Sequence, residues 1–188
     1  RALDVLAAAQ MDLEDYDQAE TNFQRSLQLR RGALPDDHPD IAQSLNNLGS
    51  LYMRSKRYDR AVPLLEQASD RYRQILGDRH PQVVVVIYNL GSTLSDAGKL
   101  DRARAQLQTA WRLATEVFPE GHLNTAVIQA KYGECLGRLA HFEKAETLLI
   151  PAFESISSQL GEHHWRSLQT ARMIEELHSA QGKPSRDQ

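Results

Sequence analysis

Residues 45–52 carry a short pattern that returns along the chain at a constant interval. They read Leu45-Asn46-Asn47-Leu48-Gly49-Ser50-Leu51-Tyr52. The pair Leu48-Gly49 returns 42 residues later as Leu90-Gly91, and again after the same interval as Tyr132-Gly133. Leu45, Leu48, Gly49 and Tyr52 have the spacing i, i+3, i+4 and i+7, which is one face of an α-helix. The pattern therefore predicts an amphipathic helix that occurs several times.

A second helix follows the first in each unit. After residues 55–57, the residues Tyr58, Ala61, Leu65 and Ala68 form another helical face. Two residue types recur at the 42-residue interval, as His38, His80, His122 and His164, and as Ala19, Ala61, Ala103 and Ala145. Each unit therefore reads as helix, tight turn, helix and polar loop. We predict helices near residues 1–13, 16–34, 39–55, 58–76, 81–97, 100–118, 123–139, 142–160 and 165–181.

Repeats of this length predict an all-α protein, a right-handed α-solenoid of antiparallel helix pairs. We expect one array over residues 1–184, with units of about 1–37, 38–79, 80–121 and 122–163. A capping helix follows at 164–182, and 183–188 form a disordered tail. Because the chain begins with Arg1 rather than methionine, we also expect it to be part of a longer protein.

Small residues recur where the paired helices must approach each other. Gly49 has no side chain, and Ala61 has only a methyl group. A glycine inside a helix costs up to about 1 kcal/mol relative to alanine, so its recurrence indicates close packing. Pro39 and Pro81 suit the first turn of a helix, where the missing N–H has no partner to lose.

The unit resembles the tetratricopeptide repeat (TPR), whose pattern is W-x2-L-G-x2-Y…A-x3-F. Leu45, Leu48, Gly49, Tyr52 and Ala61 match it, with leucine replacing the tryptophan, and Leu65 replaces the final phenylalanine. The 42-residue length and the His-Pro loop are similar to the repeats of kinesin light chain, and similar arrays occur behind bacterial serine/threonine kinase domains. The resemblance implies a concave face, lined by the first helix of each pair, that binds protein ligands.

Composition and charge exclude several other classes. The net charge is −3 and the pI is about 6.2, and duplex-binding domains usually carry a basic patch. No apolar run reaches the roughly 18 residues that span a bilayer. The single cysteine, Cys135, excludes an internal disulfide framework and favours a reducing compartment. We therefore predict a cytoplasmic protein that neither binds nucleic acid nor inserts into membranes.

The residues that the repeat phase places on the concave face form the candidate binding site. They are Gln43, Asn46, Asn47, Ser50, Arg54, Tyr88, Asn89, Ser92, Lys131, Glu134 and Arg138. An asparagine amide both donates and accepts hydrogen bonds and can hold an extended main chain. In related arrays an asparagine at the phase of Asn47 and Asn89 grips the ligand main chain. Lys131 and Arg138 add positive charge, which predicts a ligand with acidic or C-terminal carboxylate character.

No catalytic or metal-binding motif emerges from the sequence. The periodic histidines are spread along the array instead of converging as zinc ligands do, so we assign them a capping role in the loops. Cys135 is predicted to be a buried small hydrophobic residue, since no histidine and asparagine partnership suggests a nucleophile. We predict no enzymatic activity, no metal and no cofactor.

The favoured function is a protein-interaction module that binds an extended peptide or another subunit. Two alternatives remain open. The array could be a regulatory segment of a bacterial signalling enzyme such as a serine/threonine kinase. It could also be a structural module that self-associates through its end helices.

Overall fold

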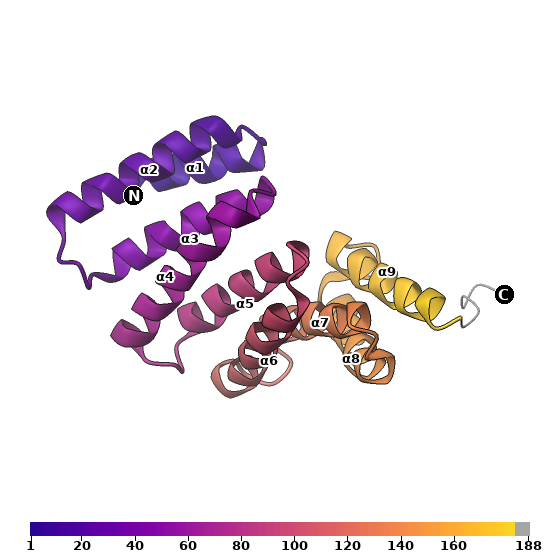
Figure 1. Ribbon diagram of the computed structural model, residues 1–188. Helices are drawn as coiled ribbons and strands as arrows, with labels where there is room; N and C mark the ends of the chain where they lie inside the picture. The colour runs from indigo at the N-terminus through magenta and orange to yellow at the C-terminus, as the bar shows by residue number, and fades with distance from the viewer. Residues whose placement is uncertain (183–188) are drawn as a thin grey trace. The chain divides into compact units, whose positions relative to one another are not determined.

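The computed structural model describes residues 1–182, and every regular element in this range is an α-helix (Figure 1). The helices are α1 Ala2–Asp12, α2 Tyr16–Ala33, α3 Pro39–Arg54, α4 Tyr58–Leu76, α5 Pro81–Asp96, α6 Leu100–Val117, α7 Leu123–Arg138, α8 Phe142–Leu160 and α9 Trp165–Ala180. Each begins and ends within two residues of its predicted bounds. The predicted tail 183–188 lies outside the described residues.

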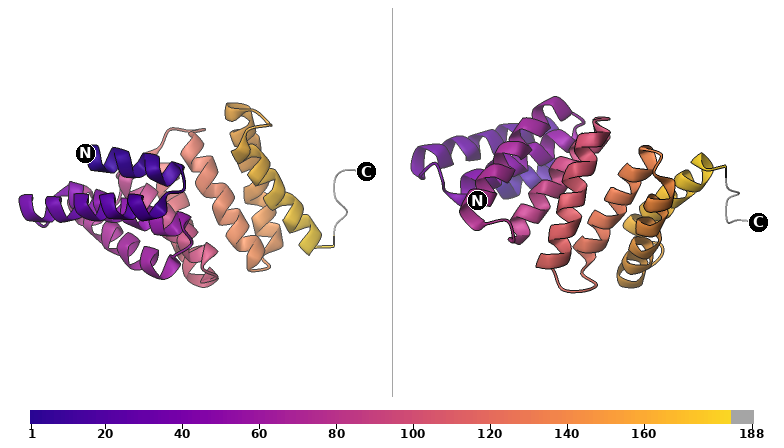
Figure 2. Two further views of the ribbon diagram at one scale, coloured as in Figure 1. Left: turned by 90° about the horizontal axis from the view of Figure 1, so that it is seen from above. Right: turned by 60° about the horizontal axis from the view of Figure 1, so that its bottom comes forward.

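The helices group into two compact units, Arg1–Ala97 and the part of the chain from Gly98 onward. In the first unit α1 packs on α2 and α3 on α4, while α2 contacts α3 and α4 contacts α5 (Figure 2). In the second unit α6 contacts α7, α7 packs on α8, and α8 contacts α9. The division falls inside the predicted repeat 80–121, so the single array with its repeat boundaries stays a prediction.

Close helix approach explains the periodic small residues. Ala19, Ala61 and Ala145 are fully buried. A Cβ added to Gly49 in α3 would lie 2.7 Å from Cγ of Leu65 in α4. A Cβ on Gly133 in α7 would lie 2.8 Å from Cγ of Leu149 in α8. Since real Cβ atoms do not approach neighbours this closely, the glycines allow the leucines to fill the space between paired helices.

The periodic histidines cap helices. In α3, α5, α7 and α9, the residue before the first helical residue is a histidine with extended backbone. Its Nδ1 accepts a hydrogen bond from the backbone N–H two residues further on, at 3.1–3.2 Å. This bond satisfies one of the N–H groups that a helix start leaves unpaired. The structure thus confirms the predicted capping role of His38, His80, His122 and His164.

Removal of one histidine cap should weaken the fold measurably. We expect His80→Ala to lower the free energy of unfolding by about 0.5–2 kcal/mol, and His80→Asn to lower it less, because an amide oxygen accepts the same N–H. Urea unfolding of both variants measures the difference. The exposed His163 is the control. Equal urea midpoints for His80→Ala and His163→Ala would contradict the capping role.

The tight turns inside the helix pairs use left-handed backbone at one repeat position. Glu14, Lys56 and Ala140 have φ of 58–61°, and Gly98 at the same phase has φ of 75°. Beyond Lys56, the N–H of Arg57 donates to the carbonyl of Tyr52 at 2.7 Å, which closes the end of α3. A helix commonly ends with a residue in the left-handed conformation, and these turns do so although only one of the four residues is a glycine.

A half-buried carboxylate helps to hold α2 against α3. Glu20 accepts hydrogen bonds from the Tyr52 hydroxyl at 2.7 Å and from Arg57 Nη1 at 2.5 Å. Arg60 Nη1 lies 3.5 Å from the same carboxylate, and the Arg57 guanidinium also stacks over the Tyr52 ring. Burial alone would raise the pKa of Glu20, but the bonds from Tyr52 and Arg57 and the charges of Arg57 and Arg60 lower it overall.

This cluster should make stability depend on acid pH. Because the folded pKa of Glu20 is lowered, its stabilisation is present above the ordinary value of 4.5 and is lost as pH falls through the folded pKa. Glu20→Gln should therefore cost about 1 kcal/mol at pH 7 and much less at the lowest pH at which the chain still folds. Urea midpoints at several pH values test this, with the exposed Glu154→Gln as control. An unchanged cost between pH 7 and the acid end would be inconsistent with the shift.

Candidate peptide-binding site

Predicted site residues of α3 are joined by side-chain hydrogen bonds. Gln43 Nε2 donates to Asn47 Oδ1 at 2.7 Å, and the Tyr72 hydroxyl of α4 donates to Gln43 Oε1 at 3.0 Å. Asn89 Nδ2 of α5 donates to Asn46 Oδ1 at 3.2 Å. These two bonded groups, Tyr72 with Gln43 and Asn47, and Asn89 with Asn46, are here together called the amide network. It fixes polar side chains from three helices of the first unit on the side predicted to bind ligand.

The amide network keeps hydrogen-bonding capacity for an outside group. Asn47 accepts through Oδ1, and Asn89 donates one of its two N–H groups. Each amide has two donors and an acceptor with two lone pairs. Both side chains are half-buried, so a ligand can reach them. The pair can therefore bind a main chain, with donors on Asn47 and an acceptor on Asn89.

Tyr72 was not among the predicted site residues. Its ring is buried, with 2% exposure, and burial raises its pKa to about 12, so the hydroxyl keeps its proton and donates. The corresponding positions carry Arg30, Ala114 and Ile156. Because the residue at the phase of Tyr72 differs in every repeat, the repeat pattern could not predict its hydrogen bond to Gln43.

The other predicted residues of the first unit have different surroundings. Arg54 Nη1 of α3 forms an exposed ion pair with Asp12 of α1 at 2.7 Å. Ser50 and Tyr88 are half-buried, whereas Ser92 is buried with 6% exposure. Ser92 therefore presents no hydroxyl at the surface predicted for it.

The predicted residues of the second unit lie together on α7. The Lys131 ammonium is 2.9 Å from Oε2 of Glu134, one helical turn further on. Both side chains are mostly buried, and Arg138 at the end of the helix is exposed. The charge of Lys131 is thus compensated within its own helix. These three residues and the amide network belong to different compact units.

A cavity of about 150 Å³ adjoins two of these residues. It lies between α7 and α9 above one residue of α8, and is here called the α7–α9 pocket. Its lining consists of Glu134, Gly137, Arg138, Leu149, Met173, Glu176, Leu177 and Ala180. Of these lining residues, the sequence predicted only Glu134 and Arg138 as binding-site residues.

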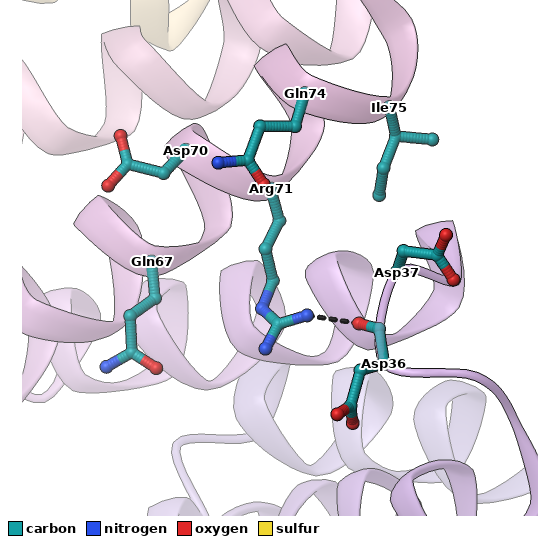
Figure 3. A pocket seen from close by; sticks show the side chains of 7 residues that line it. All are labelled: Asp36, Asp37, Gln67, Asp70, Arg71, Gln74 and Ile75. Atoms are coloured by element: carbon teal, nitrogen blue, oxygen red, sulfur yellow. Dashed lines mark hydrogen bonds between the residues drawn. The ribbon is translucent and has the colours of Figure 1, made fainter.

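A larger hollow lies away from every predicted site residue (Figure 3). It has a volume of about 710 Å³ and lies between the α2–α3 loop and α4. Asp36, Asp37 and Asp70 provide three carboxylates, and Arg71 donates a hydrogen bond to the carbonyl of Asp36. Gln67, Gln74 and Ile75 complete the lining. The residues form a hydrophilic, acidic surface that holds no nucleophile.

Cys135 is a buried residue of α7. It is fully buried, and its Sγ lies 3.6 Å from the carbonyl oxygen of Leu100 in α6. Burial raises the pKa of the thiol, which disfavours the reactive thiolate. Within residues 1–182 no three His, Cys, Asp or Glu side chains are grouped to hold a metal ion. No helix in that range is long and apolar enough to cross a membrane.

Comparison with known proteins identifies the repeats. The family model described as tetratricopeptide repeat matches residues 1–74, 40–116 and 85–150. Nephrocystin-3 of Xenopus laevis is 53% identical over 45 residues, and that of Xenopus tropicalis 51%. Those 45 residues are 24% of this chain but only 4% and 3% of the two relatives.

Two solved structures share the fold. One comprises the nearly identical TPR-like repeats of a Podosopora anserina protein described as a kinesin light chain, with a TM-score of 0.81 and 18% identity. The match covers 97% of this chain and 86% of that one. The other is BtubC (BKLC) from P. vanneervenii, with a TM-score of 0.79, 21% identity and coverage of 96% and 72%. The predicted all-α solenoid of kinesin-light-chain-like repeats is thus confirmed.

Proposed function

Because this chain belongs to the tetratricopeptide repeat family, we propose that it binds an extended peptide or partner subunit along the first helices of its pairs. Tetratricopeptide arrays are in general protein-interaction modules, so the class of function follows from the family. The observation that carries the specific proposal is the amide network. It holds Asn47 and Asn89 in place while leaving amide groups for a ligand main chain.

Main-chain binding explains the chemistry of the network. Peptide N–H and C=O groups occur in every ligand, and a fixed amide can satisfy one of each. The bond that Gln43 donates to Asn47 and the bond that Asn89 donates to Asn46 restrict the side chains before binding, so less conformational entropy is lost on association. The network therefore supplies affinity, while neighbouring side chains select the sequence.

The acidic ligand has weaker support than main-chain binding. Lys131 is paired with Glu134, so one of the two cations behind that prediction already has a counter-charge. We keep the acidic ligand as a testable proposal: affinity that falls steeply with salt, and falls further in Lys131→Glu, supports it. An affinity that changes neither with salt concentration nor in Lys131→Glu would exclude the acidic ligand.

A capture experiment tests the main proposal. Wild-type chain and the variant Asn47→Ala/Asn89→Ala are immobilised and exposed to lysate of the native cells. A partner retained by the wild type and depleted on the variant supports binding through the network. Partners retained equally by both would show that another surface is used.

Self-association is the second candidate function, because both end helices expose large apolar side chains. Val5 of α1 is 71% exposed, and Leu13 directly after α1 is 81% exposed; on α9, Trp165 is 62% and Leu168 is 54% exposed. Light scattering over a range of concentrations tests this, with Leu13→Ser and Leu168→Ser as variants. A monomer at all concentrations would exclude it. Attachment to a kinase domain is a further proposal, which the complete coding sequence decides.

A further inference from the structure

Two small residues of the α7–α9 pocket stand where other repeats have larger ones. Gly137 lies at the phase of Met53 and Ser95. Ala180 lies at the phase of Arg138 and Asp96. Gly137 lets Leu177 approach α7 closely, since an added Cβ would lie 3.0 Å from Cδ1 of Leu177, and Ala180 is exposed in the last turn of α9. The pocket is therefore specific to this part of the array.

The floor of the pocket is aliphatic. Leu149 of α8 and Leu177 of α9 are almost completely buried, with 1% and 4% exposure, and Met173 of α9 lies beside them. A cavity of about 150 Å³ holds one group about the size of a benzene ring. The methionine is unbranched and adapts to the shape of a neighbouring group. One branched or unbranched aliphatic side chain fits this space.

The rim of the pocket carries charges of both signs, from Glu134, Arg138 and Glu176. Lys131 lies against Glu134, and Arg138 already has an interaction within the protein. Glu176 of α9 is exposed, and it has no ion-pair partner in the part of the chain that the structure describes. A cation that enters beside the aliphatic floor would find this carboxylate.

Met173 also relates the pocket to the predicted binding face. It occupies the same repeat phase as Asn47, Asn89 and Lys131. Within the second unit, a ligand that follows this phase from Lys131 of α7 to Met173 of α9 would reach the pocket lining. The pocket is therefore placed to bind a side chain of such a ligand.

We propose that the α7–α9 pocket binds one aliphatic side chain of leucine or methionine size, with a lysine or arginine next to it in the ligand sequence. The proposal rests on the proposed peptide-binding function and adds the ligand residue type. The aliphatic group contacts Leu149, Met173 and Leu177. The neighbouring cation pairs with Glu176.

Capped dipeptides test the pocket directly, by NMR of the isotope-labelled chain. The probe is N-acetyl-Lys-Leu-N-methylamide, and the comparison ligands replace Leu with Ala or Lys with Glu. We expect shifts at the Gly137 amide and the Met173 methyl group. The Ala ligand should bind about tenfold more weakly or not at all, and the Glu ligand about two- to fivefold more weakly.

Three variants assign the binding to this pocket. Gly137→Met introduces the residue of the α3 repeat and should abolish the shifts. Ala180→Leu should fill the pocket from an exposed position in the last turn of α9. It therefore replaces Gly137→Met as the blocking variant if that protein does not fold. Glu176→Gln should remove the preference for Lys over Glu and leave binding of the leucine group.

The outcomes are separable from those of the proposed function. Shifts that persist in Ala180→Leu, or equal affinity for the Leu and Ala ligands, would overturn the pocket assignment. So would absence of binding by the wild type at ligand concentrations of tens of millimolar. None of these results involves Asn47 or Asn89, whose role is decided by the capture experiment. Failure of the amide network alone would leave the dipeptide result intact.

Discussion

Replacement of Arg30 by alanine is expected to lower the free energy of unfolding by about 3 kcal/mol, because it removes one partner of a mostly buried ion pair. Arg30 Nη2 of α2 lies 2.7 Å from Oδ2 of Asp4 in α1, and the two side chains are only 13% and 14% exposed. Arg30 Nη1 also donates to the Asp40 carbonyl and the Ser44 hydroxyl of α3. The variant would leave the Asp4 carboxylate without its nearest cation.

The next repeat suggests how this loss can be repaired. At the phases of Asp4 and Arg30 it carries Asn46 and Tyr72. Asp4→Asn/Arg30→Tyr should therefore recover most of the stability, because no charge stays buried. Urea unfolding of the single and double variants measures this, and the exposed Arg31→Ala is the control. A cost of Arg30→Ala no larger than that of Arg31→Ala would contradict the account.

Gly49→Ala is expected to lower the free energy of unfolding by about 2 kcal/mol through overpacking. The new Cβ would lie 2.7 Å from Cγ and Cδ2 of Leu65, which is fully buried and has little room to move. The higher helix propensity of alanine offsets part of this cost, by up to about 1 kcal/mol. Leu65→Ala in the same chain should remove the clash, so the double variant should cost less than the sum of the two single ones.

Gly32→Ala is the matched control with the opposite sign. Gly32 lies near the end of α2, and nothing lies within 4 Å of an added Cβ. Only the higher helix propensity of alanine remains, so the free energy of unfolding of this variant should rise by about 0.5–1 kcal/mol. Thermal and urea unfolding report both effects. Equal shifts for Gly32→Ala and Gly49→Ala would mean that Gly49 is not at a close helix contact.

The helices could be predicted from sequence because they rest on local and periodic signals. His80 and Pro81 mark a helix start, and the polar residues 55–57 mark the turn between two helices, so boundaries agree with the structure to within two residues. Apolar spacing then identifies the buried face, as for Leu65, which is fully buried. Each signal is repeated, so an error in one unit is corrected by the others.

The details of the candidate site depend on contacts that do not repeat. Tyr72 bonds to Gln43, but its counterparts in other repeats are not tyrosines. Lys131 was predicted as a cation for the ligand, and its neutralisation by Glu134 depends on rotamers that a phase assignment does not contain. The pocket beside Gly137 depends on how Leu177 packs against that glycine, which other repeats do not share. Periodicity reports what repeats share, whereas selectivity arises where they differ.

The measurement closest to the central claim is the affinity of the purified chain for a peptide from its captured partner. Titration calorimetry compares wild type, Asn47→Ala/Asn89→Ala and the exposed control Gln108→Ala. Loss of about two net hydrogen bonds to the ligand predicts an affinity at least about tenfold weaker for the double variant and no change for Gln108→Ala. The same dissociation constant for all three proteins would contradict peptide binding through the amide network.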